Sequence, residues 1–141
     1  MKKYKKNFYI LITGRADYYI LEKLFLSLKK RYNIFFIFIY SNGKDKTYFT
    51  IKKNLKLISG KIVLEYCYIN KNISKSISNI INYINKKSYL INGELIVLGD
   101  RFETFAVSVA SHLNKKKIIH FSGGEITEGS LDNFFRNSIS L

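Results

Sequence analysis

Three short segments of the sequence gather glycines, charged residues and a histidine in patterns that suit ligand binding or catalysis. The first is TGRADY, Thr13 to Tyr18. A glycine there permits a tight turn, backbone N–H groups at a helix start can face an anion, and Arg15 can add a charge-assisted hydrogen bond to phosphate. The segment lacks the three-glycine dinucleotide fingerprint and the P-loop ending. An ordinary strand-to-helix turn with a surface arginine therefore remains the alternative.

The second segment is GDRFE, which follows the apolar run LIVL at residues 95–98. Asp100 is then expected at the carboxyl end of a buried strand. A carboxylate in that position is partly desolvated, so its pKa can be tuned for acid or base work. The structural alternative is that Asp100 is the N-cap of the next helix. Spacing alone leaves both interpretations open.

The third segment is HFSGGEITEGSLDNFFR, which runs from His120 to Arg136. A purely structural connection seldom needs so many glycines beside so many carboxylates, so this pattern predicts a functional loop. Glu128 by itself is expected to be solvated. No metal site is expected, because His120 and the carboxylates lack a tight ligand spacing and the other histidine, His112, falls in a predicted helix.

Short apolar runs and longer segments of helical periodicity alternate along the chain and must position these three segments. The expected strands are 8–12, 34–40, 62–66, 95–98 and 118–121, and the expected helices are 17–31, 48–58, 73–84, 102–113 and one from about residue 131. Strands that are apolar throughout suit a parallel sheet covered by helices on both faces. We therefore expect a single Rossmann-like, doubly wound α/β domain over residues 1–141. Ligands of such sheets bind beyond the carboxyl ends of the strands, where all three segments fall.

The charge of the chain raises the question of a polyanionic partner. Lys and Arg number 24 against 10 Asp and Glu, which gives a formal net charge of +14. However, Lys, Asn, Ile, Tyr and Phe are abundant together while Pro and Trp are absent, a profile that AT-rich coding produces whatever the function. The lysine-rich stretch from Lys44 to Lys61 is interpreted as a solvated helix face. We therefore expect no nucleic-acid partner and keep a polyanion-binding module as an alternative.

The single cysteine, Cys67, excludes an internal disulfide and a cysteine-based zinc cluster, and it is expected to be a small buried hydrophobe. The basic start precedes an apolar run, Phe8 to Ile12, that is shorter than the hydrophobic region of a signal peptide. No stretch approaches the roughly 20 apolar residues of a membrane span. A cytoplasmic protein without membrane contact is the expectation.

Taken together, TGRADY, VLGDRFE (Val97 to Glu103) and HFSGGEITEGSLDNFFR resemble the hydrolysing UDP-N-acetylglucosamine 2-epimerases of sialic and nonulosonic acid biosynthesis, in order and in spacing. The resemblance implies a GT-B enzyme that holds a UDP-sugar between two Rossmann-like halves. This chain would be the N-terminal half, with the C-terminal domain missing. The implied reaction eliminates UDP to give 2-acetamidoglucal, which water then converts to N-acetylmannosamine. No metal or redox cofactor is implied.

The resemblance also assigns residues. It implies catalytic roles for Asp100, Glu125 and Asp132. It implies substrate contacts for Arg15, Asp17, Tyr18, Arg101, His120, Gly123, Gly124 and Arg136.

The sequence departs from the family pattern at several of these places. Gly14 abuts Arg15 directly, Ser122 precedes the glycine pair, and Asn137 follows Arg136 where a histidine is usual. After Ile139, Ser140 and Leu141 replace the expected Thr-Lys. These differences leave two enzyme-related hypotheses. The chain is half of an epimerase, completed by a homo-oligomer or by a separate C-terminal-domain chain, or it is a non-catalytic remnant that folds and binds a sugar nucleotide weakly.

Overall fold

The computed structural model describes residues 5–41, 46–69, 72–122 and 132–140. Strands and helices alternate through these residues, as the alternation of apolar runs and helical periodicity predicts. The elements are β1 (Asn7–Ile12), α1 (Arg15–Leu28), β2 (Asn33–Ser41), α2 (Lys46–Leu57), β3 (Lys61–Tyr68), α3 (Ile73–Lys87), the 3-10 turn η1 (Ser88–Leu90), β4 (Glu94–Leu98), α4 (Phe102–Leu113), β5 (Ile118–Phe121) and α5 (Asp132–Ser140).

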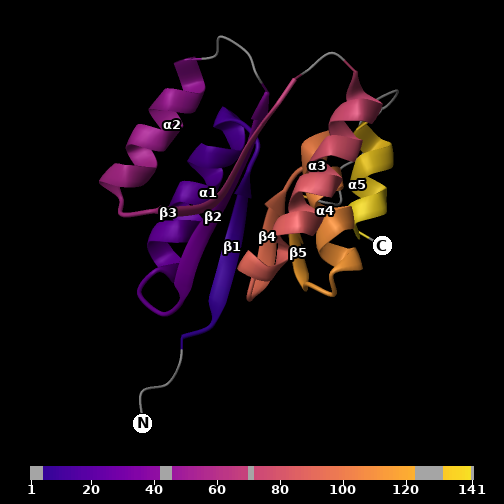
Figure 1. Cartoon of the computed structure of the whole chain (residues 1–141). Coiled ribbons are helices and arrows are strands. Elements are labelled where there is room, and N and C mark those ends of the chain that lie inside the picture. Colours follow the sequence, from indigo (N-terminus) through magenta and orange to yellow (C-terminus); the bar gives the residue numbers. More distant parts are fainter. Residues whose placement is uncertain (1–4, 42–45, 70–71, 123–131, 141) are drawn as a thin grey trace.

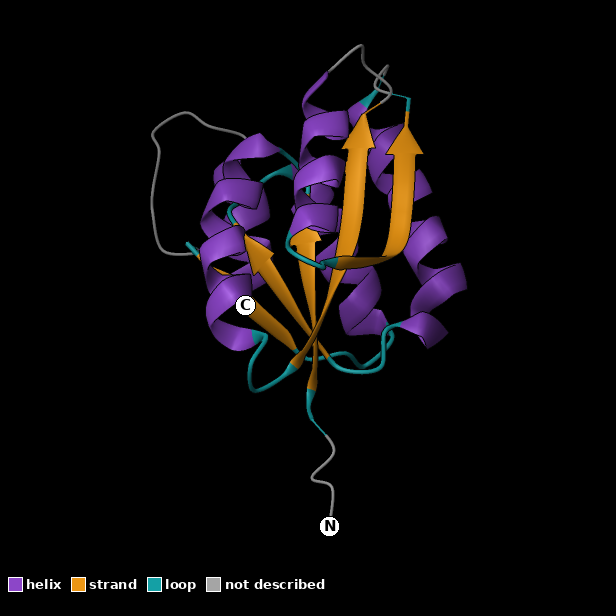
Figure 2. Ribbon diagram, turned by 90° about the vertical axis from the view of Figure 1, so that its left-hand side faces the viewer, coloured by secondary structure: helices purple, strands orange, loops and turns teal. Residues whose placement is uncertain are grey.

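The strands form one sheet in the order β3-β2-β1-β4-β5. Every neighbouring pair is parallel, so all strands point the same way in Figure 2. The strand order reverses between β1 and β4, which pair through Phe8–Glu94, Tyr9–Leu95 and Ile10–Ile96. Such a reversal opens a crevice at the carboxyl ends of the two strands, where doubly wound folds bind their ligands.

Helices cover both faces of the sheet (Figure 1). Ile10 and Ile12 of β1 pack with Leu21 of α1 and Leu55 of α2 on one face. The alternate strand residues, such as Leu11, pack on the other face with residues of α3 and α4, and Ile139 of α5 lies against the same core. Both sides of each central strand are therefore buried, which explains why these strands are apolar at successive positions between their ends. The expected Rossmann-like, doubly wound fold is confirmed.

The expected element bounds agree with the structure to within about three residues, slightly more than the usual uncertainty of helix ends. The largest shift is in α1, which begins at Arg15 and ends at Leu28 rather than covering 17–31. Among the described helices, none combines the length and the apolarity that crossing a membrane requires.

The expectation for Cys67 is wrong. Its side chain is exposed. Cys67 lies in β3, an edge strand, whose one neighbour among the described strands is β2; Tyr40 is the residue opposite Cys67. A strand with a neighbour on one side only does not bury every residue, so an apolar run at a sheet edge overstates burial.

Candidate functional site

Asp100 lies just beyond the carboxyl end of β4 and forms an ion pair with Arg136 of α5. The Nη2 of Arg136 donates to Oδ2 of Asp100, and the two side chains are 7% and 19% exposed. Nη1 of Arg136 donates to Asn133 at 3.4 Å. A buried guanidinium is costly unless it is paired, so Asp100 neutralises Arg136 and anchors α5 beside the end of β4. The N-cap of α4 is Arg101, so the alternative interpretation of Asp100 as that cap is wrong.

His120 supports the same corner from β5. Its Nε2 lies 2.7 Å from the carbonyl oxygen of Gly99, and its Nδ1 lies 3.0 Å from Oγ of Ser140. Because a carbonyl oxygen only accepts, Nε2 donates to Gly99, and in the neutral imidazole Nδ1 is then the nitrogen that accepts from the serine hydroxyl. Gly99 has φ +74, in the left-handed region. His120 thus holds the peptide that precedes Asp100 and links it to α5.

The turn between β1 and α1 is closed by Asp17. Both the backbone N–H and the hydroxyl of Thr13 donate to Oδ2 of Asp17, at 3.1 and 2.5 Å. Gly14 is the N-cap of α1 and has no side chain to bond the helix start. Arg15 opens the helix and is exposed. Asp17 therefore shapes the turn, and Arg15 is the charged group that the turn presents to solvent.

Tyr18 points into the protein rather than out of it. It is 1% exposed, and its hydroxyl donates to Glu22 at 2.9 Å. Burial raises the pKa of Tyr18, and the hydrogen bond to Glu22 raises it further. The Tyr18 hydroxyl is thus a neutral donor to Glu22, and its ring packs in the core between α1 and the sheet.

Arg101 is held by a buried carboxylate. Its Nη2 and Nε donate to the two oxygens of Glu103, at 2.9 and 3.3 Å, and the Tyr68 hydroxyl donates to Glu103 Oε1 at 2.6 Å. The hydrogen bond to Glu103 raises the pKa of Arg101. Burial and then the bond to Glu103 raise the pKa of Tyr68. A Cβ on Gly14 would lie 3.2 Å from Nη1 of Arg101, so this guanidinium lies directly over the β1–α1 turn.

A pocket of about 150 Å³ lies at this turn. Its lining residues are Thr13, Gly14, Arg15, Phe38, Tyr40, Ser41, Tyr48, Ile51 and Arg101. Two guanidinium groups beside a tight backbone turn suit an anionic ligand, and the tyrosines supply flat apolar walls.

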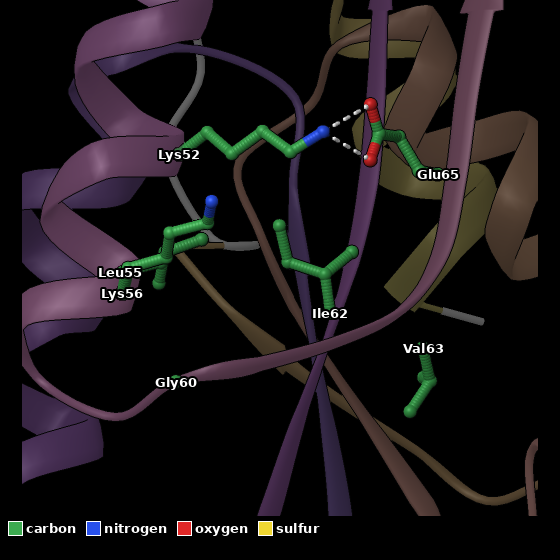
Figure 3. Close-up of a pocket in the computed structure, with 7 residues that line it drawn as sticks. All are labelled: Lys52, Leu55, Lys56, Gly60, Ile62, Val63 and Glu65. Atoms are coloured by element: carbon green, nitrogen blue, oxygen red, sulfur yellow. Dashed lines mark hydrogen bonds and ion pairs between the residues drawn. The ribbon is translucent and has the colours of Figure 1, made fainter.

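A larger pocket, of about 270 Å³, lies between α2 and β3 (Figure 3). Its Lys52 and Glu65 point toward each other, with Nζ 3.0 and 3.1 Å from the two carboxylate oxygens. The two side chains neutralise each other in an ion pair, so this pocket does not present an unpaired Lys52 or Glu65 charge to a ligand. We therefore place the candidate site at the smaller pocket and at the group of Asp100, His120 and Arg136, which we call the Asp100 corner.

The structure brings most of the site residues predicted from sequence to the end of the sheet where the carboxyl ends of its strands lie. Asp100, His120 and Arg136 form one group, and Arg15 and Arg101 line the adjacent pocket. Asp132 is exposed at the start of α5, one turn before Arg136. Glu125, Gly123 and Gly124 lie outside the described residues.

Sequence reasoning missed the supporting roles of Tyr68 and Glu103. Tyr68 ends an apolar strand and Glu103 stands in the first turn of a helix, so neither pattern signals a buried hydrogen bond across 35 residues. The described residues contain no group of three His, Cys, Asp or Glu side chains that would hold a metal ion.

Comparisons with known proteins agree on one family. Residues 40–141 match the family model described as UDP-N-acetylglucosamine 2-epimerase. Polysialic acid biosynthesis protein P7 of Escherichia coli is 27% identical over an alignment of 142 positions, which covers 93% of this chain and 36% of that protein. GDP/UDP-N,N'-diacetylbacillosamine 2-epimerase (hydrolyzing) of Campylobacter jejuni is 27% identical over an alignment of 143 positions, which covers 96% of this chain and 37% of that protein.

The solved structures agree on the fold. The crystal structure of UDP-GlcNAc 2-epimerase from Neisseria meningitidis bound to UDP-GlcNAc has a TM-score of 0.76 and 18% identity, over 95% of this chain and 38% of that one. The fold matches the N-terminal domain of such GT-B structures. The chain thus spans little more than a third of the length of the curated relatives it matches.

Proposed function

The chain belongs to the UDP-N-acetylglucosamine 2-epimerase family, and from this we propose that it supplies the N-terminal half of a hydrolysing 2-epimerase acting on UDP-N-acetylglucosamine. The observation that carries the proposal is the position of Asp100. Its carboxylate stands where the strand order reverses, beside Arg136, and the residue that follows it, Arg101, lines a pocket together with Arg15.

The first step of the proposed reaction is an elimination. Asp100 removes the proton from C2 of the sugar while the bond between C1 and the diphosphate oxygen breaks. The electron pair of the C2–H bond forms the C1–C2 double bond, and UDP leaves with the electron pair of the C1–O bond. Arg136 occupies one carboxylate oxygen of Asp100, and the side chain is 19% exposed. The carboxylate is therefore positioned and still partly accessible, as a general base must be.

Positive charge assists departure of UDP. Arg15 and Arg101 both line the pocket at the β1–α1 turn. Guanidinium groups bind phosphate oxygens with paired N–H donors and stabilise the negative charge that develops on the leaving group. We assign these two arginines to the diphosphate.

The second step adds water across the double bond of 2-acetamidoglucal. A hydroxyl joins C1 and a proton returns to C2 on the opposite face, which gives N-acetylmannosamine. That proton needs a second acid on the other side of the ring, with a pKa different from that of the base. We assign it to the pair Glu125 and Asp132, of which Asp132 opens α5 beside the Asp100 corner.

We further propose that a second Rossmann-like half completes the cleft. A pocket of about 150 Å³ is small for a nucleotide sugar, which needs a site that covers most of its surface. The alternative is that the chain is a remnant that binds a sugar nucleotide without turning it over.

Proton NMR in D2O tests this function. The folded chain, and a fusion of the chain to the C-terminal remainder of the Campylobacter jejuni relative, are each incubated with UDP-N-acetylglucosamine. We expect the fusion to release UDP and N-acetylmannosamine deuterated at C2, and the chain alone to release neither. A fusion that folds but releases no product would support the alternative that the chain is a non-catalytic remnant.

Charge-removing variants identify the base within an active fusion. Asp100→Asn is expected to lower turnover by about a thousandfold or more. Glu94→Gln is the matched control, because it also removes one ion pair, with Lys6, but lies at the amino end of β4. Near-normal turnover by Asp100→Asn would contradict the assignment.

A further inference from the structure

The ion pair between Arg101 and Glu103 is unequally exposed. The Arg101 side chain is 51% exposed, whereas Glu103 is 1% exposed. Removing a carboxylate from water is costly, and a partner that stays half in solvent returns only part of that cost. Replacing a buried ion pair by a well-packed apolar side chain is often neutral or stabilising, so stability alone does not account for a carboxylate here. The arrangement is therefore better explained by what it does to Arg101.

Glu103 fixes Arg101 through two bonds and is itself fixed by Tyr68. The two carboxylate oxygens engage Nη2 and Nε of Arg101, which leaves Nη1 on the side of the Gly14 turn. The Tyr68 hydroxyl donates to Glu103 Oε1 at 2.6 Å. Tyr68 is 3% exposed and its ring packs edge-on against Phe102 at 5.6 Å, so the donor cannot move away easily. These contacts run from the end of β3, through the start of α4, to the β1–α1 turn.

We propose that Tyr68 and Glu103 are positioning residues that hold the Arg101 guanidinium over the Gly14 turn, ready to bind the diphosphate of the nucleotide sugar. The ligand in this proposal rests on the proposed function, whereas the placement of Arg101 rests on the contacts above. A free arginine side chain loses rotamer freedom when it binds a ligand, and an arginine already fixed loses little. Tyr68 does not line the pocket and acts only through Glu103 and Arg101.

The test uses inorganic pyrophosphate as the probe and amide NMR of the isolated chain as the readout. Pyrophosphate is expected to shift the amide signals of residues 13–17 and 101. Arg101→Gln is expected to weaken this binding by about tenfold or more, and Tyr68→Phe by about three- to tenfold. The matched controls are Arg31→Gln, which removes a positive charge elsewhere, and Tyr83→Phe, which removes a hydroxyl that donates to the Glu65 carbonyl. Both are expected to bind as the unaltered chain does.

The double variant separates a positioning role from a general loss of stability. Because Tyr68 acts through Arg101, Tyr68→Phe added to Arg101→Gln is expected to cause no further loss of affinity. Additive losses, equal binding by Tyr68→Phe and Tyr83→Phe, or the absence of shifts at residues 13–17 would each overturn the proposal. The Arg101 Nε–H signal gives a second readout, since its shift is expected to change in Tyr68→Phe and not in Tyr83→Phe. The outcome is independent of the epimerase test, because pyrophosphate carries no sugar.

Discussion

Arg136 of α5 donates its hydrogen bond to the carboxylate of Asp100, 36 residues earlier in the chain, and this contact joins the last described helix to the end of β4. The Nε of Arg136 is buried and has no hydrogen-bond partner among the described residues. The pairing of this guanidinium therefore depends largely on Asp100. The Asp100 carboxylate therefore contributes to the local stability of α5 and is also the proposed general base.

We expect Asp100→Asn and Arg136→Leu each to lower the free energy of unfolding by about 1–3 kcal/mol, because each leaves a largely buried charge or carboxylate without its partner. The double variant is expected to cost less than the sum of the two. Urea denaturation of the four proteins measures this coupling. Costs that add to within about 0.5 kcal/mol would show that the ion pair contributes nothing specific.

Glu65 gives the chain a pH-dependent contribution to stability. Burial alone raises the pKa of Glu65, but hydrogen bonds from Tyr48 and Lys52 outweigh it, and the net pKa lies below the usual value of 4.5. A carboxyl whose folded pKa is lowered stabilises the fold above its unfolded pKa, and this contribution is lost as the pH falls through the folded value.

We therefore expect Glu65→Gln to lower the free energy of unfolding by about 1 kcal/mol at pH 7. The difference from the unaltered chain is expected to shrink below pH 4.5, the usual carboxyl value. Urea denaturation at a series of pH values from 7 down to 3 checks this. A difference that stays constant across the series would contradict the assignment of the effect to the charged carboxylate.

Two glycines are required for different reasons and are expected to respond differently to alanine. A Cβ on Gly93 would lie 2.3 Å from the backbone oxygen of Asn7, so Gly93→Ala must push β1 and β4 apart. We expect a loss of about 3 kcal/mol. Gly99 has φ +74 and open space around it, so Gly99→Ala is expected to cost only about 1 kcal/mol of backbone strain. Thermal unfolding of both variants is the measurement, and equal losses would contradict this distinction.

The exposed thiol of Cys67 is expected to react in the folded protein. A thiol reagent such as Ellman's should modify it at a rate within about tenfold of the rate in denaturant, because access does not require unfolding. Spectrophotometry of the released thiolate follows the reaction. Modification that begins only in denaturant would show that the side chain is buried.

The fold was predictable from sequence because its signal is local and repeated. Strands such as Ile34 to Tyr40 are apolar at successive positions, and helices such as Phe102–Leu113 carry apolar residues at helical spacing. The rule that ligands bind beyond the carboxyl ends of parallel strands then placed Asp100 and Arg15 at one edge. Each of these inferences needs only the residues within one element.

The internal contacts of the site were not predictable in the same way. Whether Asp100 caps a helix or binds Arg136 depends on where α5 packs, and whether Glu103 faces solvent or Tyr68 depends on how β3 and α4 approach each other. Charge and periodicity along the sequence carry no information about such distant pairs. Cys67 shows the converse error, because an apolar run does not reveal whether its strand is central or at an edge.

The pairing of β1 with β4 also limits the order in which the strands of the sheet can pair during synthesis. Strands β1, β2 and β3 are neighbours in the sheet and come from the first 68 residues, so they can pair as soon as they emerge from the ribosome. The other side of β1 stays unpaired until β4, Glu94–Leu98, has been synthesised. Until then the nascent chain carries an apolar strand with one open edge, which is the kind of surface that associates with other chains.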